Sequence, residues 1–149
     1  LTIDATTGNP TGSGEINDAI DKDYFELSPA DMGSDGDLLK VDIYANRDGY
    51  IKAYESSGFG SLLEPTIKVF DVSTSPITEI TTSRYVDNSD SVIASEGIRG
   101  PFPTLSTVFQ VRAGAVYQFE ISEESSLYDD PTVTGFNNAY LIEVVNLGQ

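Results

Sequence analysis

Acidic side chains gather at three points of the chain where turns between strands are expected. They are Asp21 and Asp23, then Asp31, Asp35 and Asp37, and then Asp87, Asn88 and Asp90. Calcium takes about six to eight oxygen ligands, which carboxylates, Asn side chains and loop carbonyls supply. An extended backbone places Asp21 and Asp23 on one face, where their charges repel unless a cation sits between them. The sequence therefore predicts calcium at one or more of these clusters.

Each cluster also has an interpretation without metal. In an Asx turn the Asp side chain accepts a hydrogen bond from a nearby backbone N–H, and such a turn needs no cation. Both interpretations stay open for the three clusters. Asp129 and Asp130, which precede Pro131, are interpreted as an ordinary loop. An EF-hand is not expected at residues 31–42, because Gly33 takes a ligand position and strands flank the segment.

A second candidate site is aromatic. Tyr and Phe rings offer flat, amphipathic faces on which sugar rings can stack. The candidates for such a ligand-binding platform are Tyr44, Tyr50, Tyr54, Phe59 and Tyr85. The alternative is that these rings belong to the core and edges of the fold.

Catalysis is not predicted. The chain contains no His and no Cys, which excludes thiol nucleophiles, disulfides, Cys or His zinc sites and a Ser-His-Asp triad. Paired carboxylates can hydrolyse glycosides, but with 24 acidic residues among 149 such pairs arise by chance. No nucleophile elbow or comparable signature is present. We therefore expect a protein that is not an enzyme.

The charge and hydropathy of the chain argue against two classes of partner. The chain has 24 Asp and Glu against 8 Lys and Arg, a net charge of −16. Such a surface opposes phosphate backbones, because nucleic acid binding is driven by Lys and Arg, so no nucleic acid partner is expected. The apolar runs are far shorter than the roughly 20 residues that cross a bilayer, so no membrane insertion is expected. The acidity favours an extracellular or cell-surface location.

These candidate residues must be positioned by strands, because two-residue alternation of apolar and polar side chains runs through the sequence. Leu39, Val41 and Ile43 alternate with polar residues, and Ile67, Val69 and Asp71 share another face. Strands are expected at residues 15–20, 24–28, 39–45, 50–54, 66–71, 77–82, 91–95, 104–111, 116–121 and 140–145. The last is apolar on nearly both faces, which is typical of a central strand. The pattern predicts an all-β fold, an antiparallel β-sandwich of jelly-roll-like type.

Glycine residues mark the expected turns between the strands. Asp35-Gly36, Asp48-Gly49 and Ala113-Gly114 lie between apolar runs, where Gly permits positive φ. Residues 1–14 are rich in Thr, Gly and Asn, which predicts an N-terminal arm or linker, and residues 15–149 are predicted to form a single β-sandwich domain.

The order of several short motifs resembles the bacterial pre-peptidase C-terminal domain family. Asp21-Lys22-Asp23-Tyr24-Phe25 resembles the Asp-x-Asp-x-Phe segment that leads into a strand of that family. The strands led by Gly36-Asp37, by Pro65 and by Gly114, and the closing strand at residues 139–144, follow in the order of the family. Residues 87–90 are looser than the family's Asn-Asp-Asp loop, and residues 47–63 resemble an insertion. The resemblance implies a small β-sandwich carried as an accessory module on secreted hydrolases and surface proteins, often binding calcium and sometimes a polymeric substrate.

Two functions follow as expectations. The first is a calcium-stabilised, non-catalytic module that binds or tethers to a polysaccharide or protein polymer. The second is a self-assembling subunit of an extracellular filament, sheath or surface layer. In the second, Thr2, Ile3, Asp4 and Ala5 add as a strand to the sheet edge of another copy, and calcium bridges acidic surfaces that otherwise repel.

Overall fold

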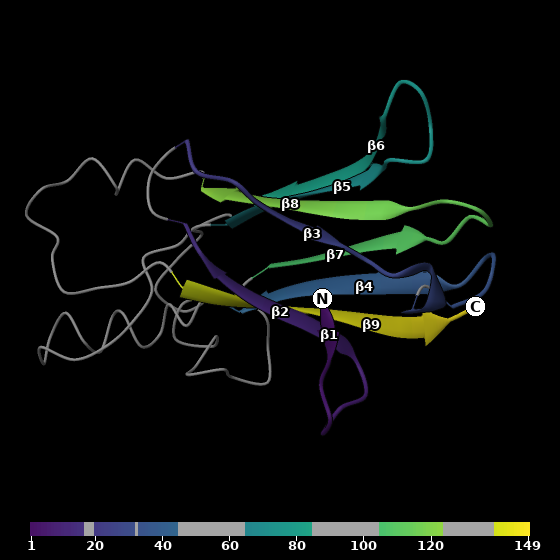
Figure 1. Ribbon diagram of the computed structural model, residues 1–149, viewed down its shortest axis with the longest axis horizontal. Coiled ribbons are helices and arrows are strands. Elements are labelled where there is room, and N and C mark those ends of the chain that lie inside the picture. The colour runs from purple at the N-terminus through teal and green to yellow at the C-terminus, as the bar shows by residue number, and fades with distance from the viewer. Residues whose placement is uncertain (17–19, 32, 45–64, 85–104, 124–138) are drawn as a thin grey trace, which may run out of the picture.

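Two antiparallel sheets pack against each other, so the predicted all-β sandwich is confirmed (Figure 1). The computed structural model describes residues 1–16, 20–31, 33–44, 65–84, 105–123 and 139–149. The elements are β1 (Thr2–Ile3), β2 (Pro10–Glu15), β3 (Asp23–Glu26), the 3-10 helix η1 (Pro29–Asp31), β4 (Leu38–Tyr44), β5 (Pro65–Asp71), β6 (Thr78–Arg84), β7 (Leu105–Gln110), β8 (Tyr117–Glu123) and β9 (Ala139–Gly148). Among these described residues no helix is long and apolar enough to cross a membrane.

The strands divide unevenly between the sheets. The five-stranded sheet has the order β1-β2-β9-β4-β7, and the four-stranded sheet has the order β3-β8-β5-β6. Only β1 to β2 and β5 to β6 follow each other within one sheet among the described strands. All the remaining pairs of consecutive described strands lie in different sheets. This is the connectivity of the jelly-roll-like sandwich that was expected.

The core lies between the sheets and is built from the inward-facing positions of each strand. Leu39, Val41 and Ile43 of β4 are fully buried, as the two-residue period predicts. Ile67 and Val69 of β5 face them from the other sheet with Phe119 of β8. The strand predicted to be central, β9, pairs with β2 on one side and β4 on the other. That prediction is confirmed.

The N-terminal segment differs from the arm that its composition predicts. β1 and β2 form a hairpin, and β2 pairs with β9 from Thr11 opposite Glu143 to Glu15 opposite Ala139. The strand predicted at residues 15–20 shares only Glu15 with β2, and residues 17–19 lie outside the described part of the chain. A Gly-rich segment has the composition of a linker. Its backbone can nevertheless pair with β9, because strand pairing needs no side chain.

Two glycines of β2 let the sheets approach closely along one edge, which we call the closed edge and define as the contact between β2 and β3. A Cβ atom at Gly12 would lie 2.9 Å from the Phe25 ring of β3, and one at Gly14 would lie 2.3 Å from Asp23 Oδ2. Both distances are below any real Cβ contact. The residue type at these positions therefore sets the spacing of the layers.

The remaining strand predictions agree with the structure to within a few residues at each end for β3 to β9. The strands predicted at residues 50–54 and 91–95, and the Asp48-Gly49 turn, lie outside the described residues.

Candidate functional site

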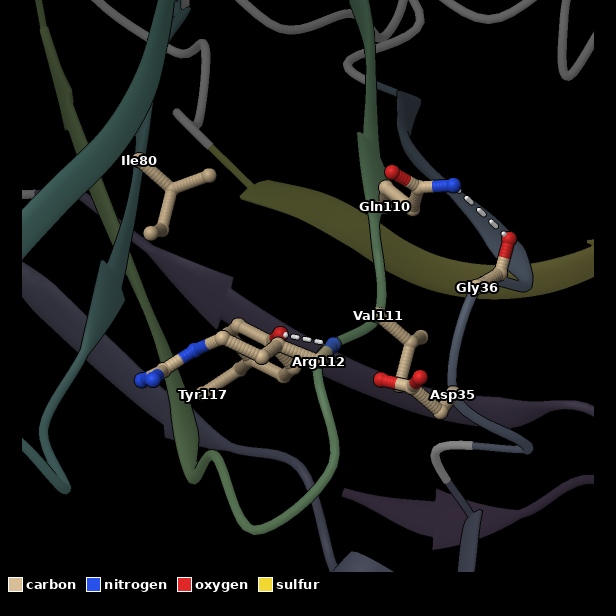
Figure 2. A pocket seen from close by; sticks show the side chains of 7 residues that line it. All are labelled: Asp35, Gly36, Ile80, Gln110, Val111, Arg112 and Tyr117. Carbon is tan, nitrogen blue, oxygen red and sulfur yellow. Dashed lines mark hydrogen bonds between the residues drawn. The ribbon is translucent and has the colours of Figure 1, made fainter.

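A pocket of about 410 Å³ lies at the other edge of the sandwich, which we call the open edge and define as the contact between β6 and β7 (Figure 2). It is open to solvent rather than enclosed, and its volume is within the range of about 300–1,000 Å³ found for ligand sites. It is lined by Asp35, Gly36, Ile80, Gln110, Val111, Arg112 and Tyr117. These residues come from both sheets and from the turns at one end of the sandwich, the turn end.

A buried carboxylate anchors one side of this pocket. The Asp71 side chain is 2% exposed, and it forms an ion pair with the guanidinium of Arg112, whose side chain is 62% exposed. Ser73 donates to Asp71 Oδ1 from its backbone N at 2.9 Å and from Oγ at 2.5 Å. Burial raises the pKa of Asp71, but the hydrogen bonds from Ser73 and Arg112 outweigh burial and lower it to about 2. Asp71 is therefore ionised at neutral pH and holds the Arg112 side chain in place.

The loop before β4 forms the opposite side. Asp35 Oδ1 accepts a hydrogen bond from the Ala113 backbone N at 2.7 Å. Gly36 N donates to the Val111 carbonyl at 2.9 Å, and Val111 N donates to the Asp37 carbonyl at 2.8 Å. Gly36 has a φ of 90°, a left-handed conformation that glycine adopts at little cost. This loop is thus joined to the end of β7 by backbone hydrogen bonds.

Tyr117 and Gln110 complete the wall between these two sides. The Tyr117 hydroxyl accepts a hydrogen bond from the Arg112 backbone N at 2.9 Å, and its ring packs edge-on against Phe109 with centroids 4.8 Å apart. Gln110 Nε2 donates to the Gly36 carbonyl at 3.2 Å. Figure 2 shows Ile80 of β6 across the pocket from Gln110, and the Arg112 side chain extends below them toward its ion pair with Asp71 at the end of β5.

The lining combines polar planar groups with apolar side chains. Its guanidinium, amide and carboxylate come from Arg112, Gln110 and Asp35, and its apolar surface comes mainly from Ile80 and Val111. Asp35 is the single acid among the described residues that line it, so the pair of carboxylates that glycoside hydrolysis requires is not assembled by this lining. The arrangement is suited to hydrogen bonding and apolar contact with a ligand.

The predicted calcium pair lies at the far end of the sandwich from this pocket. Asp23 pairs with Ile121 on β8, away from Tyr117 at the start of that strand. The buried Tyr140 donates its hydroxyl to Asp23 Oδ2 at 2.6 Å. Burial first, and then this hydrogen bond and the charges of Asp23 and Asp21, raise the pKa of Tyr140 far above its ordinary value. A hydrogen-bond donor therefore faces Asp23 Oδ2.

The second predicted cluster is divided among separate partners at the turn end. Asp31 ends η1, and Asp35 contacts the Ala113 backbone. Asp37 Oδ2 accepts from the Ser34 N at 2.9 Å and from Asn146 Nδ2 at 3.1 Å, and hydrogen bonds from these two residues lower the pKa of Asp37. These contacts correspond to the turn interpretation that needs no cation.

Within the described part of the chain, no three acidic side chains gather closely enough to hold a metal ion. Calcium also takes backbone carbonyl and amide oxygens, so calcium at the first two clusters stays a prediction. The third cluster, Asp87, Asn88 and Asp90, lies outside the described residues. Calcium binding stays a prediction.

The predicted aromatic platform is described at one position. Tyr44 is half-buried at the end of β4, and burial, followed by the charges of Asp42 and Glu143, raises its pKa. The other predicted members, Tyr50, Tyr54, Phe59 and Tyr85, lie outside the described residues.

The predicted assembly segment is structured within its own chain. Thr2 and Ile3 form β1 and pair with Thr11 and Pro10. Asp4 begins the turn that follows, because its Oδ1 accepts from the backbone N of Thr6 and Thr7 at 2.7 and 2.9 Å. Ala5 is exposed in this turn.

The pocket at the open edge was not predicted, although the sequence contains one signal for it. Asp71 alternates with Ile67 and Val69, which places an acid on a buried face, and a buried carboxylate requires a charged or hydrogen-bonding partner. Arg112, directly before the predicted Ala113-Gly114 turn, is that partner. Ile80 carried no comparable signal, because its place in the pocket depends on how the two sheets are packed together.

Comparison with known proteins found no match in two searches. The chain matches no protein-family model, and no curated protein matches it. The resemblance to the pre-peptidase C-terminal domain family therefore stays a prediction from the motifs.

Proposed function

We propose that this chain is a non-catalytic β-sandwich module that binds a polymeric ligand at the open edge. The observation that carries the proposal is the form of the pocket. It is wide enough for a ligand unit yet open to solvent, so a bound unit can continue as a chain beyond it. An enclosed cavity would favour a small molecule instead.

The rigidity of the lining supports this proposal. Ion pairing to buried Asp71 holds Arg112, and backbone hydrogen bonds join the loop at Asp35 and Gly36 to the end of β7. A site whose groups are already fixed loses less conformational entropy when a ligand binds. The sequence has no His and no Cys, and Asp35 is the single acid among the described lining residues. Both observations support a binding role rather than a catalytic one.

A sedimentation assay tests the proposed site. Insoluble cellulose, chitin, starch and collagen are each mixed with the protein and spun down, and we expect wild type to bind at least one of them. Ile80→Arg places a long side chain into the pocket and should abolish sedimentation. Ile77→Arg is the matched control, because Ile77 is 58% exposed on the same hairpin and does not line the pocket. Equal binding by the two variants would exclude the open edge as the site.

Calcium stabilisation and an extracellular or cell-surface location belong to the same proposal, and the net charge of −16 supports both. Adding EDTA should lower the melting temperature, and calcium should restore it, because a ligand that binds only the folded state stabilises it. Asp90→Asn should reduce the calcium effect, whereas Asp35→Asn should leave it unchanged. A melting temperature indifferent to EDTA and calcium would remove calcium from the proposal.

Self-assembly is a second candidate, favoured by the position of β1. β1 ends the order of the five-stranded sheet, and Ile3 is 52% exposed on it. The unpaired backbone groups of an exposed edge strand can pair with a strand of another copy. Light scattering with and without calcium tests this: Ile3→Lys should prevent polymers, and Ile77→Lys should not. Monodisperse wild type at high protein and calcium concentrations would contradict assembly.

A further inference from the structure

We propose that the ligand unit in the open-edge pocket is a neutral, polyhydroxylated ring, as in an uncharged polysaccharide, rather than a charged or peptide group. This inference rests on the proposed binding function and narrows it to one chemical class. It is argued from the charge of the pocket and from the geometry of its hydrogen-bonding groups.

The pocket does not favour an anionic ligand. Among the described residues that line it, Arg112 is the one cationic side chain, and it is already paired with the ionised carboxylate of Asp71. Asp35 adds a negative charge on the other side, and the chain as a whole carries −16. A polyanion would therefore approach against the field of the protein and find no uncompensated cation in the pocket.

A cationic ligand lacks a free carboxylate among the described residues of the pocket. Asp71 is buried and already paired with Arg112, whose side chain extends toward it at the end of β5. Asp35 is the single acid among the described lining residues, and its Oδ1 already accepts a hydrogen bond from the Ala113 N–H. An ammonium or guanidinium group would thus meet a carboxylate whose hydrogen-bonding capacity is partly used.

Hydroxyl groups of a ligand match the hydrogen-bond donors and acceptors that the pocket still offers. The guanidinium of Arg112 presents several N–H donors in one plane, and the amide of Gln110 offers an acceptor beside the donor that it gives to Gly36. A hydroxyl both donates and accepts, so neighbouring hydroxyls on a ring can satisfy a donor group and an acceptor group together. The C–H face of the ring can lie against Ile80, which is 41% exposed, and Val111. The pocket therefore offers partners both for the polar edge of a sugar ring and for its apolar face.

Affinity electrophoresis in native gels tests the ligand class. The acidic protein migrates through gels that contain one soluble polymer each: mixed-linkage β-glucan, xyloglucan or dextran as neutral chains, alginate as a polyanion, and gelatin as a protein. We expect retardation by at least one neutral glycan and none by alginate or gelatin. The affinity should change less than about twofold between low and high salt, because screening acts on charge pairs and not on hydroxyl contacts.

Variants locate the binding on the protein. Gln110→Ala should weaken binding to the neutral glycan about fivefold, the loss of one hydrogen-bonding group, and Ile80→Arg should weaken it by more than about tenfold. The matched controls are Gln118→Ala, on the outer face of β8, and Ile77→Arg. Neither lines the pocket, and both should bind as wild type.

The outcomes separate this inference from the proposed function. If alginate or gelatin is bound, Ile80→Arg abolishes that binding, and neutral glycans do not bind, then the open edge is the site and the ligand class is wrong. If a neutral glycan is bound equally by wild type, Ile80→Arg and Gln110→Ala, the site is wrong and both proposals fall. Absence of binding to every polymer, soluble and insoluble, would also overturn both.

Discussion

The two long edges of the sandwich differ in the side chains that lie between the two sheets. At the closed edge, Gly12 and Gly14 remove side chains from β2, and β3 packs directly against the strand. At the open edge, Ile80 of β6, Gln110 at the end of β7 and Arg112 in the turn that follows line the pocket at the turn end. The side chains that the facing strands carry thus decide where two layers pack closely and where they leave room for a ligand.

The carboxylates at the two edges also have different partners. At the closed edge, Asp23 accepts from the neutral Tyr140 hydroxyl, and burial and this contact raise the pKa of Tyr140. At the open edge, Asp71 is paired with charged Arg112 and its pKa is lowered to about 2. A neutral donor suits a sealed contact, whereas the exposed guanidinium keeps part of its hydrogen-bonding capacity at the surface.

The largest effect is expected at the closed edge, from Gly14→Ala. Its Cβ would lie 2.3 Å from Asp23 Oδ2 and 2.5 Å from the Tyr140 hydroxyl, so these side chains must shift and their hydrogen bond is disturbed. We expect the free energy of unfolding, measured by urea denaturation, to fall by about 3 kcal/mol. Gly114→Ala is the control: its Cβ meets nothing within 4 Å, and its positive φ alone costs about 1 kcal/mol. Equal losses would show that close approach of the sheets is not what Gly14 provides.

Asp71→Asn should have the largest effect at the open edge, with a loss of about 2 kcal/mol at pH 7. The pKa of Asp71 is about 2 in the folded protein against an ordinary value of 3.8. The stability that it contributes is therefore present above about pH 4 and is lost as the pH falls toward about 2. The difference in unfolding free energy between wild type and Asp71→Asn should shrink across this interval. A difference independent of pH would contradict the ion pair, and Glu79→Gln, an exposed acid on β6, serves as control.

Tyr140→Phe should lower the free energy of unfolding by about 1 kcal/mol, because it leaves Asp23 without its hydroxyl donor. Tyr24→Phe removes a hydroxyl that donates to Glu120 at 3.2 Å from a residue 53% exposed, and it should change stability less. Absorbance titration provides a second measurement. Because the pKa of Tyr140 is strongly raised, wild type and Tyr140→Phe should show the same phenolate signal near pH 10, and a smaller signal in the variant would contradict the buried hydrogen bond.

The smallest effect is expected for Gln110→Ala at the open edge. This side chain is exposed and its hydrogen bond to the Gly36 carbonyl is long, at 3.2 Å. The free energy of unfolding should change by less than about 0.5 kcal/mol, so any loss of glycan binding by this variant reports on contact with the ligand. A large loss of stability would mean instead that Gln110 holds the loop before β4.

Much of the fold was predictable because alternation is a local property. Leu39, Val41 and Ile43 show which face of β4 is buried whatever the partner strand, and the apolar faces of β9 indicate its central place. β2 was misplaced because Gly12 and Gly14 carry no side chains from which an alternation could be recognised. Their function as spacers exists only in relation to Phe25 and Asp23.

The candidate site was less predictable. Asp35 and Asp37 were recognised as clustered acids, but whether a carboxylate meets a cation or a backbone N–H depends on distances that the spacing of residues does not define. The pocket joins Ile80 to Arg112, which are far apart in the chain, and the buried acid at Asp71 was the single local hint of its presence.

By itself, the sequence determined the β-sandwich, the strongly acidic surface and the exclusion of thiol and imidazole chemistry, because composition and period-two patterning act residue by residue. Tertiary structure alone decided that the N-terminal glycines close one edge and that Arg112, held by Asp71, stands beside a pocket at the other. The reason is physical: the spacing between two sheets is set by pairs of side chains from different strands, and such pairs form only when the layers meet.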